Sequence, residues 1–256
     1  MQNEDILQVL GKIEDAGNLV DGGKIDRYWN KEGLTIDLQK FTGSEDVEAE
    51  TWLHDSEIAL KHFNLRSIEF GNWMSQQDRA NFLYAAMLGL RDLAIVLGVQ
   101  PRDMGLGGRL SIALGARGSG KALGHYERTP YSIINLTKTK GMSGVLAHEF
   151  AHAVDNIISF HTKSKQDFVS GGRTTRKGFD EDIAKKGNYF EQQFENFFNI
   201  LYFDRKGNST DFSKALSKKD EYWNRRLEVL ARTFEVYVSE QLKEKNITNH
   251  FLARSQ

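Results

Sequence analysis

The stretch GVLAHEFAHAVDNIISF, residues 144–160, decides both the fold class and the chemistry that this chain predicts. It contains the pentapeptide His148-Glu149-Phe150-Ala151-His152, an HExxH pattern. Residues four apart lie on one face of an α-helix, so both imidazoles can reach a single metal ion. The glutamate between them can hold a water molecule against that ion. The spacing therefore predicts the zinc-binding helix of a metallopeptidase.

The other residues of this helix favour the same interpretation. Its polar side chains fall on one narrow stripe, and the remaining side chains from 146 to 160 are apolar. A stripe that faces water usually carries Lys or Arg, and this one has neither. Asp155 lies one turn beyond His152 on the stripe. We expect it either to accept a hydrogen bond from a ligand imidazole or to be a structural carboxylate at a distance, and both remain open.

Composition limits the classes of function. A chain of 256 residues can bury a substantial core, and its net charge of −1 does not point to nucleic acid or to an anionic membrane as a partner. Cysteine is absent, so any metal must be held by histidines and carboxylates. The first residues are acidic, and no apolar run approaches the roughly 20 residues of a membrane span. We expect a cytoplasmic protein.

A third metal ligand must come from elsewhere in the chain. The extended pattern HExxHxxGxxH is excluded, because Asp155 and Ile158 stand at its glycine and third-histidine positions. The remaining source is a glutamate on a later helix. The segment EYWNRRLEVLARTFEVYVSEQL (221–242) offers Glu228 and Glu235, and both border its apolar face. On helical angle alone these two residues tie.

The order of the predicted elements indicates an α+β protein. A capped helix is expected from Ser75 to Gly98, and further helices at 189–203 and 221–245. RLSIALG (109–115) and YSIINLT (131–137) are expected to be strands joined by a glycine-rich hairpin. YSIINLT is a candidate edge strand that pairs with an extended substrate, or equally an ordinary buried strand. Residues 162–188 are expected to form a mobile surface loop.

Three further residues or motifs invite a functional interpretation. GARGSGKA (115–122) resembles a phosphate-binding P-loop, but Ala122 stands where the pattern needs Ser or Thr for magnesium, so nucleotide binding is not expected. His125 and Tyr222 are candidate donors to an oxyanion that develops during peptide hydrolysis, with packed, hydrogen-bonded residues as the alternative.

Several segments of the chain resemble a known family. IEFGNWMSQQDRANFL (68–83), GLGGRLSIALGARGSGKALGHYE (105–127), INLTKTKGMSGVLAHEFAHAVDN (134–156) and EVLARTFEVYV (228–238) resemble the large polyvalent protein-associated domain of the first type. That domain is zincin-like and occurs in proteins of phages and conjugative elements. The HEFAHAVD run is also similar to that of anthrax lethal factor, a zinc metallopeptidase.

The resemblance implies a role for particular residues. It favours Glu228 as the third ligand and Tyr222 as a tyrosine that assists catalysis. The family pattern places an acidic residue four positions after the ligand, and this chain has Arg232 there.

We therefore expect one Zn²⁺ per chain, with Glu149 as general base and a protein or peptide as substrate. The alternative is a non-hydrolytic zincin scaffold that binds a host protein or protects incoming DNA. The expected organisation is an N-terminal region (1–67), a zincin-like catalytic domain with a small sheet beside the HExxH helix and a mainly helical C-terminal part (68–245), and a tail (246–256). The sequence does not predict an oligomeric state.

Overall fold

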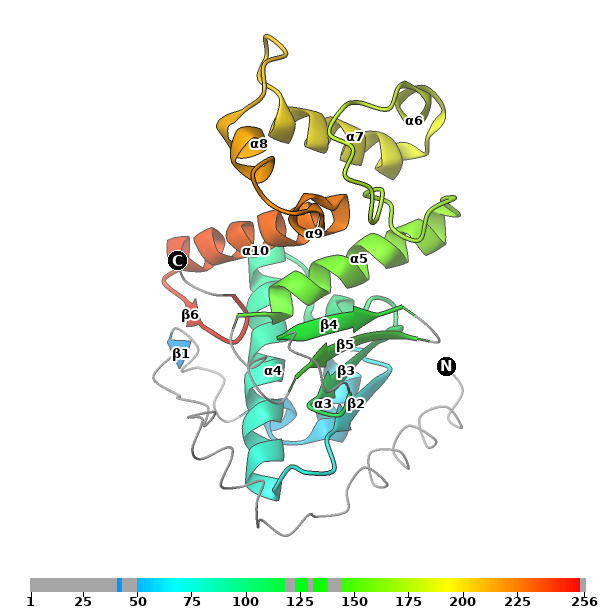
Figure 1. Ribbon diagram of the computed structural model, residues 1–256. Coiled ribbons are helices and arrows are strands. Elements are labelled where there is room, and N and C mark those ends of the chain that lie inside the picture. Colours follow the sequence, from blue (N-terminus) through cyan, green and yellow to red (C-terminus); the bar gives the residue numbers. More distant parts are fainter. Residues whose placement is uncertain (1–40, 43–49, 118–122, 129–130, 138–143, 254–256) are drawn as a thin grey trace. The chain divides into compact units, whose positions relative to one another are not determined.

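The computed structural model confirms the α+β class and describes residues 41–42, 50–117, 123–128, 131–137 and 144–253 (Figure 1). The chain divides into two compact units. Unit 1 comprises residues 1–153 with 235–256, and unit 2 comprises residues 154–234. The chain passes from one unit to the other inside two helices, α5 (Leu146–Thr162) and α10 (Arg226–Glu244).

Unit 1 contains a mixed sheet with the strand order β2-β3-β5-β4. Its strands are β2 (Ser67–Phe70), β3 (Leu110–Leu114), β4 (Gly124–Glu127) and β5 (Ser132–Leu136). The two pairs β2–β3 and β3–β5 are parallel, whereas β4 runs antiparallel to β5. All five residues of β3 are buried, as expected for an interior strand of a parallel sheet.

Helix α4 (Gln76–Leu97) connects β2 to its parallel neighbour β3. The hydroxyl of Ser75 accepts the backbone N–H of Asp78 at 3.1 Å, and Gly98 ends the helix with a φ of 67°. Both predicted ends are therefore confirmed. Among the described helices, α4 alone is long and apolar enough to cross a membrane. However, 67% of its apolar 18-residue segment is buried inside the protein. That burial is typical of a core helix.

The prediction for the segment between the two expected strands was wrong in one respect. The strands at 109–115 and 131–137 exist as β3 and β5, but they are parallel, so no hairpin joins them. The segment contains the additional strand β4, which pairs with β5 and forms the edge of the sheet. YSIINLT is consequently an interior strand, which is the second of its two predicted interpretations. Lys121 and Ala122 of the P-loop resemblance lie outside the described residues.

The two faces of the sheet differ in polarity. One face carries Ile68, Ile112 and Ile134 in one cross-strand row, all fully buried. The other carries Glu69, Ala113, Asn135 and His125 in one row, because neighbouring residues of a strand point to opposite faces. Arg117 ties this second face together, since its guanidinium binds both Glu69, at 2.9 and 3.1 Å, and Glu127 of the edge strand, at 3.0 Å.

The end of the chain is part of unit 1. Strand β6 (Thr248–Asn249) pairs with β1 (Phe41–Thr42), and the side chain of Asn249 donates to the buried Asp92 of α4 at 2.8 Å. The N–H of Ala147 in the first turn of α5 donates to the carbonyl of Leu252 at 3.0 Å. A backbone group from the C-terminal segment thus satisfies one of the N–H groups that every helix start exposes. The predicted domain limits at 67 and 245 remain predictions.

The remaining elements in the described part of unit 1 are short. They are the 3-10 helices η3 (Thr51–Leu53) and η4 (Pro101–Gly105) and the helix α3 (Ser56–His62). Asp55 caps α3 by accepting the N–H groups of Glu57 and Ile58 at 2.8 and 3.1 Å.

Unit 2 is helical. Besides its parts of α5 and α10 it contains α6 (Glu181–Lys186), α7 (Tyr189–Tyr202), α8 (Asp211–Leu216) and α9 (Glu221–Asn224). Its core is formed by Phe198, Tyr202, Leu216 and Val229. The helix predicted at 189–203 is confirmed as α7.

Two predictions in unit 2 needed correction. The helix expected over 221–245 is interrupted at Arg225, whose ψ of 131° is extended, so it forms the separate helices α9 and α10. The expected surface loop at 162–188 contains helix α6, and its residues 169–172 are buried. Both differences have the same physical reason. Carbonyls of this loop accept the first N–H groups of α10, so the loop is partly buried and a new helix starts after Arg225.

Candidate metal centre

The two histidines of the HExxH motif lie on helix α5 and face the same side. Their ring centroids are 4.9 Å apart and the ring planes are nearly perpendicular, at 86°. His152 is buried, with 6% of its surface exposed, and His148 is partly buried. This is the arrangement expected of residues one helical turn apart.

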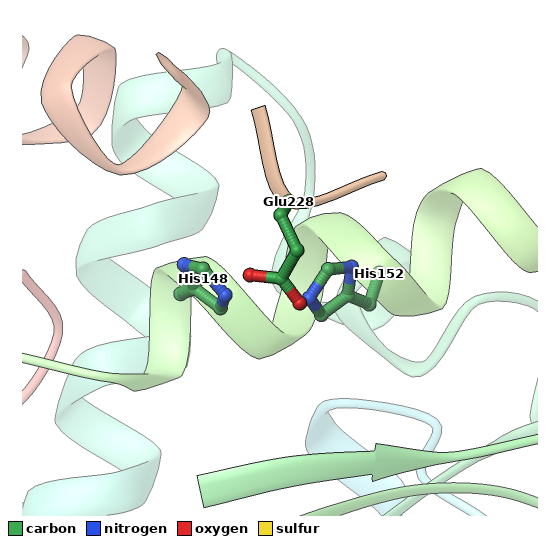
Figure 2. Close-up of side chains that lie close together, drawn as sticks. All are labelled: His148, His152 and Glu228. Atoms are coloured by element: carbon green, nitrogen blue, oxygen red, sulfur yellow. The ribbon is translucent and has the colours of Figure 1, made fainter. Parts of the chain in front are cut away.

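Glu228 of α10 completes a group of three. One potential ligand atom from each of His148, His152 and Glu228 lies within 4.8 Å of the others, and in the described part of the chain this is the one such group. Figure 2 shows the Glu228 carboxylate directed between the two imidazole rings. The structure thus distinguishes the two glutamates that tied on helical angle, and it is Glu228 that joins the histidines.

The start of α10 determines where Glu228 lies. The first N–H groups of the helix donate to carbonyls of the 169–174 loop, from Arg226 to Thr174 at 2.8 Å and from Leu227 to Gly172 at 3.0 Å. Arg226 is fully buried, lies 4.0 Å above the ring of Phe198, and forms an ion pair with Glu195 at 2.7 Å. The 169–174 loop and the buried Arg226 therefore fix the first turn of α10. This turn carries Glu228.

Asp155 holds the same loop from helix α5. Its carboxylate accepts the N–H of Ser170 at 2.8 Å and the hydroxyl of Ser170 at 2.5 Å. Burial raises the pKa of Asp155 to about 6, against the opposing effect of the hydrogen bonds from Ser170. The contacts with Ser170 correspond to the second of its two predicted roles, that of a structural carboxylate. They connect Asp155 to Glu228 through the loop and the first turn of α10.

Arg232 occupies the position where the family pattern has an acid, and it contacts Glu228 directly. Its guanidinium donates to Oε2 of Glu228 at 2.9 Å. The same guanidinium stacks on Trp223 at 3.9 Å from the ring centroid and lies 5.4 Å from that of Tyr222. Arg232 therefore lies between Glu228, which it binds, and the ring of Tyr222. The side chain of Tyr222 is 48% exposed. A carboxylate has two oxygens, so pairing at one is compatible with metal coordination by the other.

Glu235 lies beside His148, a contact that the sequence alone did not predict. Its Oε2 is 3.6 Å from Nδ1 of His148, and both side chains are mostly buried. The signal in the sequence was only that Glu235 borders the apolar face of its helix.

Glu149, the predicted general base, is buried beside the edge strand β4. Only 5% of its surface is exposed. A methyl group added at Gly124 of β4 would meet Glu149 Cγ at 3.2 Å and Val145 Cγ1 at 2.8 Å. A glycine at this position of the strand therefore allows α5, with its glutamate, to approach the sheet closely.

His125 follows Gly124 and points to the opposite face of the sheet. Its Nε2 lies 2.8 Å from Glu127 Oε1, and its Nδ1 lies 3.5 Å from the amide nitrogen of Asn135. Gly124 faces α5, so His125 faces away from it. The structure does not bring this candidate oxyanion donor to the HExxH helix; it shows the hydrogen-bonded alternative.

The donor set fits a zinc ion. Two imidazoles and one carboxylate are a known protein ligand set for a zinc site that keeps a position for water. Two of the three side chains, His152 and Glu228, are almost completely buried. This cluster could hold a metal ion, and its chemistry favours a borderline-soft divalent cation over Ca²⁺ or Mg²⁺, which prefer oxygen ligands.

Comparison with known proteins supports the predicted resemblance. Residues 215–256 match the sequence model of the family described as "Large polyvalent protein-associated domain 1". Over this segment the chain is similar to that family. The match includes α9, α10 and β6, and thus Tyr222, Glu228 and Glu235, but it does not extend to the HExxH motif. No curated protein and no solved structure matches the chain.

Proposed function

We propose that this protein is a zinc-dependent metallopeptidase that hydrolyses peptide bonds of an intracellular protein substrate, in the service of a phage or conjugative element. The observation that carries the proposal is the proximity of His148, His152 and Glu228, whose ligand atoms lie within 4.8 Å of one another next to the buried Glu149. The family match at 215–256 supports the association with a mobile element.

Each group has a defined task in this proposal. His148, His152 and Glu228 would hold Zn²⁺, which polarises a scissile carbonyl and lowers the pKa of water. Glu149 takes the proton from the attacking water and passes it to the nitrogen of the leaving amine. Tyr222, close to Glu228 through Arg232, would donate a hydrogen bond to the developing oxyanion.

The edge of the sheet gives a place for the substrate. Strand β4 lies at the end of the strand order, and its Gly124 is in contact with the helix of Glu149. An extended peptide added along an edge strand would use backbone hydrogen bonds for affinity and would bring its carbonyls past the general base. This role replaces the one predicted for β5.

The test is a comparison of wild type with Glu149→Gln, which we expect to retain zinc and fold. Protein N-termini produced in cells that express each form are compared across the proteome. New N-termini that depend on Glu149 are expected, with cleavage rates of the identified peptides at least about a hundredfold lower in the variant. Glu240→Gln, an exposed glutamate on α10, is the matched control and should cleave like wild type.

Two outcomes would contradict the proposal. Equal cleavage by wild type and Glu149→Gln would exclude the general-base mechanism. Zinc bound at one per chain without any Glu149-dependent cleavage would favour the non-hydrolytic scaffold instead.

A further inference from the structure

Helix α10 carries two acidic residues on the side of the metal cluster, and only Glu228 joins it as a candidate ligand. Glu235 comes seven residues later, roughly 10.5 Å along the helix axis, and it is not one of the three residues whose potential ligand atoms lie together. The contact that Glu235 makes is with His148 Nδ1, at 3.6 Å from its Oε2. Glu235 therefore needs an explanation other than direct coordination.

The position of this carboxylate relative to the imidazole ring suggests one. Nδ1 and Nε2 lie on opposite sides of the ring, so a histidine that binds a metal through Nε2 directs the N–H of Nδ1 away from the ion. Histidines that bind metals almost always donate that second N–H to a carboxylate, carbonyl or water, which fixes the tautomer and the ring orientation. Glu235 Oε2 lies on the Nδ1 side of His148.

The acidic residue that the family pattern places four positions after the ligand cannot serve here. That position is Arg232, and its guanidinium binds Glu228 at 2.9 Å. A cation at this place cannot accept an N–H from a histidine. Glu235, one turn further along α10, does lie within ion-pair distance of His148 Nδ1.

We propose that Glu235 is the positioning residue of His148: its carboxylate accepts the N–H of Nδ1 and holds the ring so that Nε2 faces the metal. The inference rests on the metal-binding part of the proposed function and not on peptidase activity. The 3.6 Å separation is longer than a hydrogen bond, and a shift of about 0.6 Å or more brings the two atoms to the usual 2.7–3.0 Å. Bound zinc would fix the orientation of the His148 imidazole, and a fixed ring favours this shorter contact with Glu235.

The test measures zinc affinity by competition with a chromophoric chelator. The full chain is compared with Glu235→Gln, which keeps an oxygen acceptor without the charge, and with Glu235→Leu, which removes the acceptor but keeps the size. Affinity is expected to fall in the order wild type, Gln, Leu, with the Leu variant about 10- to 100-fold weaker than wild type. Glu240→Gln, on the exposed face of the same helix, is the matched control and should bind like wild type.

Two further measurements separate positioning from a general structural role. The melting temperature of the zinc-free protein should be the same for all forms. The visible absorption of the Co²⁺-substituted protein should change in Glu235→Leu and be partly restored in Glu235→Gln, because these bands report the coordination geometry. A loss of affinity accompanied by an equal loss of zinc-free stability would overturn the proposal.

Glu228→Gln distinguishes the failure of this inference from failure of the proposed function. If wild type binds no zinc, the metal site itself is wrong. If wild type binds zinc and Glu228→Gln weakens it, while both Glu235 variants bind like wild type, only the positioning role of Glu235 is excluded.

Discussion

Gly124 shows how a single residue limits the approach of a helix to a strand. The Cβ of an alanine at this position would lie 2.8 Å from Val145 Cγ1, 3.1 Å from the carbonyl oxygen of Asn135 and 3.2 Å from Glu149 Cγ. Val145 immediately precedes the HExxH helix, Glu149 lies in its first turn, and the third neighbour is the backbone of the adjacent strand. Neither the helix nor the strand can move without disturbing the packed core.

We therefore predict that Gly124→Ala lowers the free energy of unfolding by about 1–3 kcal/mol, the usual cost of overpacking. Urea denaturation of the zinc-free protein measures it. Gly178→Ala is the matched control, because nothing lies within 4 Å of the added methyl group there. Equal stability of the two variants would mean that β4 and α5 are not in close contact.

Asp155 gives a prediction about pH. Burial raises its pKa to about 6, from an unperturbed 3.8, even though Ser170 donates two hydrogen bonds to it and Arg226 adds a favourable charge. The folded protein thus binds the proton more tightly than the unfolded chain does. The resulting stabilisation is complete below pH 3.8 and is lost as the pH rises through about 6.

The expected effect is a difference between wild type and Asp155→Asn that depends on pH. Between about pH 4 and 7, the free energy of unfolding of zinc-free wild type should fall by up to about 3 kcal/mol relative to the variant, which cannot ionise there. Chemical denaturation at several pH values measures it. A constant difference over this range would show that Asp155 titrates normally in the folded protein.

The choice between Glu228 and Glu235 illustrates what the sequence can predict at the scale of residues. The HExxH helix and its polar stripe follow from local periodicity, and so does the position of both glutamates on one side of the later helix. Which glutamate joins the histidines depends on the position of α10 along its own axis relative to the two histidines. The periodicity of the sequence does not predict that position. The contact of Glu235 with His148 was not predicted for the same reason.

At the scale of elements, the long helices were predictable because their signals are local. Ser75 and Gly98 bound α4, and Asn188 caps α7 by accepting the N–H of Glu191 at 3.0 Å. Strand β4, in contrast, has a short and half-buried sequence, GHYE, whose strand conformation depends on pairing with β5. The break at Arg225 likewise depends on remote carbonyls of the 172–174 segment, which accept the first N–H groups of α10.

The buried ion cluster at the start of α10 can be tested directly. Burial alone would raise the pKa of Glu195, but Arg176 and Arg226 bring it below its ordinary value. Arg226 is itself fully buried on Phe198. Replacing Arg226 by Met removes one of the two cations that compensate a buried carboxylate, so we predict a loss of about 3 kcal/mol in unfolding free energy.

The control for this variant is an exposed ion pair of the same unit. Lys214 lies 3.0 Å from Asp211, and both side chains are exposed. Lys214→Met should cost less than about 1 kcal/mol in the same denaturation experiment. A comparably small effect of Arg226→Met would show that the cluster does not determine the start of α10.

At the scale of the whole molecule, the metal cluster connects parts of the chain that are far apart in sequence. His148 and His152 precede the whole of α6 to α9, and Glu228 follows it. An unfolded chain cannot hold these three side chains together, so the binding free energy of a metal ion at this cluster would add to the stability of the folded state. At a free zinc concentration one hundred times the dissociation constant, the expected gain is about 2.7 kcal/mol.

We therefore predict that zinc raises the melting temperature of wild type and that a chelator reverses the rise. Glu149→Gln should show the same rise, because a general base is not a ligand, whereas Glu228→Ala should lose most of it. Scanning calorimetry with and without zinc measures all three forms. If Glu228→Ala keeps the full shift while His152→Ala loses it, zinc is held by the histidines without Glu228, and the third ligand lies elsewhere. If Glu149→Gln loses the shift as well, that glutamate holds the metal, and another residue must serve as the base.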